Sequence, residues 1–126
     1  MDLLLTMYGI LDAFMCLIAI PMIMEWIPPN GLYGFRVRAT LNDPELWYRV
    51  NKFTGKLLLL LGIVIFLSAV ALRWLPGMNE DVYGLAMAAV VLGGLGVVVT
   101  AGLRMIWRSK KRTSSTDHEE DDQYHR

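Results

Sequence analysis

The chain has 126 residues, carries equal numbers of acidic and basic side chains, and has a mean hydropathy of +0.41. A soluble domain of this length would interrupt its apolar runs with polar residues at helical or strand spacing, whereas long runs here carry almost no charge. The composition therefore excludes an ordinary soluble domain, and we expect no nucleic-acid partner.

Three apolar segments are long enough to cross a membrane, at about residues 3–26, 57–75 and 82–107. A helix rises about 1.5 Å per residue, so roughly 20 residues cross a hydrocarbon core about 30 Å thick. The first segment follows an acidic residue, Asp2, and is longer than the apolar stretch of a signal peptide, so we expect it to be retained. We predict an all-α integral membrane protein whose three transmembrane helices lie in a domain of residues 1–108.

The basic side chains gather in the first loop, residues 27–56, and at or beyond the end of the third segment. Only Arg73 lies near the loop between the second and third segments. The positive-inside rule then places the first loop and the C-terminus in the cytoplasm and the N-terminus outside a bacterial plasma (inner) membrane. Residues 109–126 have almost no apolar side chains, so we predict a disordered cytoplasmic tail.

Inside the first loop, Asn42 or Asp43 followed by Pro44 and Glu45 predicts the start of a helix. Apolar side chains then recur at spacings of three and four or side by side, while the basic ones fall mainly on another face. This pattern predicts a short amphipathic helix lying in the headgroup layer before the second span. Gly55 is a position where the chain can hinge, so continuity of this helix with the second span is left open.

Asp12 lies near the middle of the first span, where a charged carboxylate costs on the order of 2.5–3.5 kcal/mol and usually faces protein. We expect a hydrogen bond between Asp12 and Ser68 of the second span, packed against the glycine face of the third span. Two interpretations stay open: a polar clamp between helices, or a proton or ligand site.

Small residues form stripes on two spans. The third span carries Ala86, Ala89, Gly93, Gly96 and Thr100, and the second repeats Gly55, Gly62 and Ala69 every seven residues. Small side chains let transmembrane backbones approach closely. These stripes indicate either packing within one chain or the seam of a homo-oligomer.

No pattern of residues points to catalysis. His118 and His125 lie in the polar tail, Cys16 is the lone cysteine, and no glycine-rich phosphate loop joins a strand to a helix. We expect no catalytic residue, cofactor or metal site, and a protein that is not an enzyme.

The first loop holds a spaced set of nine residues: Asn30, Tyr33, Gly34, Phe35, Arg36, Thr40, Trp47, Asn51 and Gly55. This set resembles the signature of the SdpI-type membrane immunity family, in which an asparagine and a Tyr-Gly-aromatic-Arg-Thr block precede a spaced tryptophan and asparagine. Val37 stands where the family usually has a threonine. The chain resembles the three-span unit of that family.

The resemblance implies a function. Members are multi-span proteins, and the best-known one protects its producer from a secreted, membrane-disrupting peptide toxin and holds a repressor at the membrane. We therefore expect a membrane immunity protein that meets the lipid bilayer, a peptide toxin and a cytoplasmic regulator. Two alternatives remain: a small oligomeric transporter or channel-like subunit with Asp12 as its polar site, or a structural membrane subunit.

Physical chemistry suggests roles for several residues of this set. Asn30 is suited to bind backbone donors near Pro28 and Pro29, and Gly34 to a turn whose backbone approaches its neighbours closely. Three alternative partners stay open for Arg36: a lipid phosphate, a carboxylate such as Glu25 or Glu45, or backbone carbonyls at the end of the first span. We interpret residues 30–55 as a rigid cap over one end of the helices.

Overall fold

The computed structural model describes residues 2–124, and side chains from residue 2 to residue 116. Across this range the chain is helical without strands: α1 (Asp2–Ile23), α2 (Arg38–Leu41), α3 (Pro44–Arg73) and α4 (Glu80–Tyr124). By length and composition, α1, α3 and α4 can each cross a membrane. The predicted all-α architecture with three transmembrane helices is therefore confirmed.

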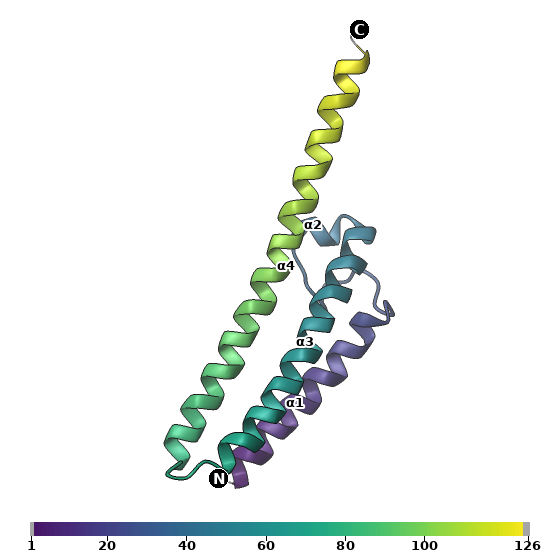
Figure 1. Cartoon of the computed structure of the whole chain (residues 1–126). Coiled ribbons are helices and arrows are strands. Elements are labelled where there is room, and N and C mark those ends of the chain that lie inside the picture. Colours follow the sequence, from purple (N-terminus) through teal and green to yellow (C-terminus); the bar gives the residue numbers. More distant parts are fainter. Residues whose placement is uncertain (1, 125–126) are drawn as a thin grey trace.

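The middle helix of the bundle is α3, which packs along both α1 and α4 (Figure 1). One end of the bundle, the turn end, holds the N-terminus and the connection between α3 and α4, residues 74–79. The other end, the cap end, holds residues 30–55, which we call the cap. An ion pair of 2.8 Å between Arg73 and Asp2 joins α3 to α1 at the turn end.

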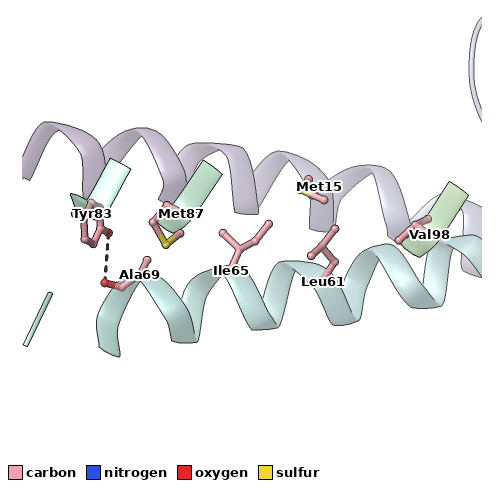
Figure 2. Close-up of a cluster of buried hydrophobic side chains, with 7 residues drawn as sticks. All are labelled: Met15, Leu61, Ile65, Ala69, Tyr83, Met87 and Val98. Carbon is pink, nitrogen blue, oxygen red and sulfur yellow. Dashed lines mark hydrogen bonds between the residues drawn. The ribbon is translucent and has the colours of Figure 1, made fainter. Parts of the chain in front are cut away.

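A buried apolar cluster runs along the bundle and contains side chains of all three long helices (Figure 2): Met15, Leu61, Ile65, Ala69, Tyr83, Met87 and Val98. Between helices in lipid, exclusion of water contributes little, so contact density carries the stabilisation. The hydroxyl of Tyr83 donates a hydrogen bond of 3.3 Å to the Ala69 carbonyl, which satisfies the polar atom of this buried ring.

The start of α3 follows the sequence prediction. Pro44 is its first residue, and the side chain of Asp43 accepts a hydrogen bond of 3.1 Å from the Leu46 amide. The amphipathic segment after it is continuous with the second span, which settles the question left open at Gly55. Its apolar face packs against Ile106 of α4 and Phe35 of the cap, and α3 continues through it without interruption.

The prediction of a disordered tail from Ser109 also differs from the structure, because α4 continues as helix to Tyr124. No glycine or proline interrupts the chain between Gly102 and Tyr124. A helix that already exists in a packed span extends without a new nucleation cost, so the polar residues continue it. The side chains beyond residue 116 lie outside the described part of the structure.

The end of α1 has a tight C-terminal turn. The Trp26 amide donates to the Pro21 carbonyl at 3.1 Å and the Glu25 amide to that of Met22, the pattern of a Schellman motif. Glu25 has a positive φ of 59°, a conformation that glycine usually supplies at this position. The chain therefore leaves the helix at Ile23, slightly before the predicted boundary.

Candidate functional site: the cap

The cap begins with a turn built on Asn30. Its side-chain oxygen accepts hydrogen bonds of 2.8 Å from the amides of Leu32 and Tyr33, and its side-chain nitrogen donates to the Pro28 carbonyl at 2.8 Å. Prolines have no backbone N–H to donate, so regular backbone hydrogen bonds are missing in this segment. The asparagine side chain supplies a donor and an acceptor in their place. The role expected for Asn30 is thus present in the structure.

Gly34, Trp47 and Asn51 form the centre of the cap. Gly34 has a φ of 104°, and a Cβ there would lie 2.6 Å from the Asn51 side-chain oxygen and 3.1 Å from the Trp47 ring. The positive φ and the lack of space for a Cβ both require glycine at position 34. The Asn51 oxygen in turn accepts a hydrogen bond of 2.6 Å from the Phe35 amide, so the loop backbone is attached directly to α3.

Trp47 is 1% exposed, and its indole nitrogen donates a hydrogen bond of 2.9 Å to the Ile27 carbonyl. The Asn51 side-chain nitrogen donates to the Trp47 carbonyl at 2.9 Å, one helical turn away. These bonds connect residues far apart in the loop to two successive turns of α3. The tryptophan is therefore a buried structural centre of the cap.

Thr40 organises the short helix α2. Its hydroxyl oxygen accepts a hydrogen bond of 3.0 Å from the Val37 amide and lies 2.9 Å from the carbonyls of both Phe35 and Val37. A hydroxyl has one proton, so it donates to one of these carbonyls at a time. Thr40 is fully buried, and it fixes the turn that presents Arg36.

Tyr33 attaches the cap to the first span. Its hydroxyl donates a hydrogen bond to the Ile18 carbonyl of α1. Burial raises the pKa of Tyr33 above its ordinary value, because the charged phenolate is poorly solvated there. The side chain therefore remains a hydrogen-bond donor at neutral pH.

Phe35 and Gly102 make a contact that the sequence did not indicate. A Cβ on Gly102 would lie 2.8 Å from the Phe35 ring and 2.9 Å from the Thr54 methyl group. The glycine of α4 thus gives the phenyl ring its space between the cap and the helix. Gly102 belongs to neither of the small-residue stripes, so its role depended on the tertiary arrangement.

Gly55 and Gly62 are both on the face of α3 that meets α1. A Cβ at Gly55 would lie 3.0 Å from the Met22 Cβ and 3.2 Å from the Ala19 carbonyl oxygen. The small-residue stripe of the second span therefore serves packing within the chain. The stripe of the third span differs, because a Cβ added at Gly93 or Gly96 would meet no atom within 4 Å among the described residues.

Asp12 does not meet Ser68 as predicted. It lies instead against Gly62 of α3, where a Cβ would be 2.7 Å from an Asp12 carboxylate oxygen. The Cys16 thiol lies 3.7 Å from the same oxygen and donates a weak hydrogen bond. Because Gly62 lets the two helices approach, the carboxylate is held between α1 and α3.

Arg36 is exposed on the surface of the cap. Within the described residues, its guanidinium group makes no ion pair or side-chain hydrogen bond. The two carboxylates considered as partners are engaged elsewhere: Glu45 pairs with Arg49 at 2.6 Å and Glu25 with Lys52 at 3.5 Å. The structure thus brings the predicted set together, with Arg36 as its outward-facing charge.

The sequence model of the SdpI/YfhL protein family matches residues 27–103, which include the whole cap, α3 and much of α4. The chain belongs to the SdpI/YfhL protein family. It is also similar to the uncharacterized protein YfhL of Bacillus subtilis (strain 168), with 32% identity over 62 residues. That alignment covers 47% of this chain and 56% of the relative, so the chain spans little more than half the length of that protein. No solved structure matches the chain.

Membership of the SdpI/YfhL family and three apolar helices identify a multi-pass membrane protein. The family match begins at residue 27, after α1 has ended, so the cap and the two following helices carry the family's sequence pattern. In this chain the cap is attached to α1 by Tyr33 and Gly55 and to α4 by Phe35.

Proposed function

We propose that this SdpI/YfhL-family protein protects a bacterial plasma membrane against a membrane-active peptide toxin or bacteriocin. We further propose that the cap lies on the cytoplasmic side and relays the presence of the toxin to a cytoplasmic regulator. The observation that carries the proposal is the exposed Arg36 on a cap whose backbone is held in place by buried side chains.

The chemistry of Arg36 supports recognition of a partner. Its guanidinium group offers donors in a rigid fork that matches a carboxylate or a phosphate. The adjacent Phe35 amide is bonded to Asn51, and Thr40 fixes the following turn, so little backbone freedom remains to be lost on binding. A preorganised charge of this kind suits an acidic surface on a regulator.

The test is survival of a sensitive bacterial host challenged with a panel of membrane-active peptides. The host expresses the wild-type protein, Arg36→Ala, or the control Arg38→Ala, which removes another exposed arginine two residues away. The abundance of each protein in the membrane is measured in parallel. We expect wild type and Arg38→Ala to protect, and Arg36→Ala to lose protection at equal abundance.

A further arm, Asp12→Asn, separates immunity from transport. The Asp12 carboxylate is packed against Gly62, so we expect the isosteric amide to retain protection. Loss of protection with Asp12→Asn but not with Arg36→Ala would favour the transporter or channel-like alternative. Equal protection by all variants would show that the proposed role of the cap through Arg36 is wrong.

A further inference from the structure

Two adjoining grooves, of about 690 and 350 Å³, lie along α3 at the cap end. The first is bounded by Glu25 after α1 and by Met105 of α4, and the second lies between α3 and α4. They share Arg49, Phe53 and Met105, and the second groove continues along α4 past Arg108 and Arg112. We call this surface the basic groove. Each of the two volumes lies in the range of small-molecule sites, which are typically about 300–1,000 Å³. Arg36 is not among its lining residues.

The charges of the basic groove are not balanced. In the first part, the acidic side chains are paired, Glu45 with Arg49 and Glu25 with Lys52. The second part is lined by three arginines and by no acidic residue. Among the described residues, Arg108 and Arg112 form no ion pair, so both guanidinium groups are available to an anion.

The groove is also amphiphilic along its length. The side chains of Phe53 and Met105 and the small Ala101 line it below the arginines, and Phe53 is 38% exposed. Ala101 and Met105 belong to the apolar segment of α4 that crosses the membrane, whereas Arg108 follows directly after it. The lining therefore changes from apolar to cationic where the apolar segment of α4 ends, and the end of a span is expected at the level of the lipid headgroups.

We propose that the basic groove binds an anionic phospholipid. Arg108 and Arg112 bind the phosphate of the headgroup, and an acyl chain lies along Phe53 of α3 and Ala101 of α4. Arginine matches a phosphate with paired donors, and the positions 108 and 112 are one helical turn apart on the same face. The bound lipid bridges α3 and α4 beside the cap.

The experiment is native mass spectrometry of the full chain released from mild detergent after incubation with phosphatidylglycerol or phosphatidylcholine. We expect a retained phosphatidylglycerol and an affinity for phosphatidylcholine lower by about tenfold or more, since one charge-assisted hydrogen bond is worth about that factor. Equal retention of both lipids by the wild-type protein would overturn the proposal.

Matched variants locate the site. Arg108→Gln with Arg112→Gln removes the two groove arginines, whereas Arg104→Gln with Lys111→Gln removes the same charge from positions of α4 that do not line the groove. The first pair is expected to weaken phosphatidylglycerol binding by about tenfold or more and the second to leave it near wild type. Equal loss in both pairs would mean a diffuse basic surface and would contradict a built site.

Two further arms test the lipid itself. Phe53→Ala is expected to reduce binding of phosphatidylglycerol, because it removes the surface under the acyl chain. Soluble glycerol phosphate is expected not to displace the bound lipid. Efficient displacement by glycerol phosphate, together with no effect of Phe53→Ala, would identify a simple phosphate site and reject the lipid. Circular dichroism of each variant confirms that its helices are intact.

Discussion

The two ends of the helix bundle are held together in different ways. At the cap end, side chains of α3 reach backbone atoms distant in the chain, such as Trp47 to Ile27 and Asn51 to Phe35. At the turn end, the Arg73–Asp2 ion pair and hydroxyl hydrogen bonds from Tyr8 and Tyr83 to backbone carbonyls join the helices. Apolar contacts accompany them, with an edge-on pair of Tyr8 and Tyr83 rings whose centroids are 6.4 Å apart. The connection itself, residues 74–79, is short.

This difference shows how a small membrane protein can fix the conformation of one of its surfaces. Hydrogen bonds are directional, and a buried donor or acceptor without its partner costs about 1–3 kcal/mol, so the cap has few alternative conformations. The connection at the turn end is mostly exposed and makes few such contacts, so substitutions in residues 74–79 are tolerated more easily. The predictions below compare equivalent substitutions at the two ends, from the largest expected effect to the smallest.

The largest difference is expected for tryptophan. Trp47→Ala removes a side chain that is 1% exposed and bonded to Ile27, and should lower the free energy of unfolding by about 3–5 kcal/mol. Trp74→Ala, at the turn end, removes a side chain that is 83% exposed and should change little. Unfolding by sodium dodecyl sulfate in mild micelles measures both. Similar losses would show that the cap is no better packed than the turn.

A second comparison uses the two glycines with positive φ, Gly34 in the cap and Gly77 in the turn. Alanine at Gly77 meets no atom within 4 Å among described residues, so only the strain of this backbone conformation is expected, about 1–2 kcal/mol. Alanine at Gly34 adds a collision with Asn51 and should cost about 1–3 kcal/mol more. The same unfolding titration measures both values. Equal costs would mean that the Asn51 side chain moves aside freely.

Two asparagines provide a third comparison. Asn51→Ala leaves the Phe35 amide without its partner and should cost about 1–3 kcal/mol. Asn79→Ala, at the turn end, removes the acceptor of a 2.9 Å hydrogen bond from the Val82 amide at the start of α4 and should cost about 1 kcal/mol. Amide hydrogen exchange should show the loss at Phe35 in the first variant and at Val82 in the second. Unchanged protection of the Phe35 amide would contradict the role of Asn51.

The smallest effect concerns pH at the cap end. The pKa of Tyr33 is raised by burial above the ordinary value of 10.0, so the folded protein holds this proton more tightly than the unfolded chain. The resulting stabilisation is fully present below the unfolded pKa and is lost as pH rises through the folded pKa. Ultraviolet titration should show a late-ionising component that is smaller by one tyrosine in Tyr33→Phe. If the wild-type protein and Tyr33→Phe gave identical alkaline titrations, the raised pKa of Tyr33 would be refuted.

Much of the cap could be predicted from the sequence because its signals are local. Asp43 and Pro44 start α3, and Asn30 stabilises a turn next to two prolines, since each acts on backbone within a few residues. The partner of Asp12 could not be found in this way. Matching residues by depth suggested Ser68, but the rotation of α1 against α3 decides which side chain it meets, and it meets Gly62.

The sequence by itself determined the number of membrane-crossing helices and the position of the cap, because apolar length and turn chemistry are properties of short segments. Only the tertiary structure decided that Trp47 is buried, that Phe35 lies against Gly102, and that Arg36 faces outward. These features depend on how three helices rotate and pack against one another, and close packing in lipid is set by side chains distant in the chain.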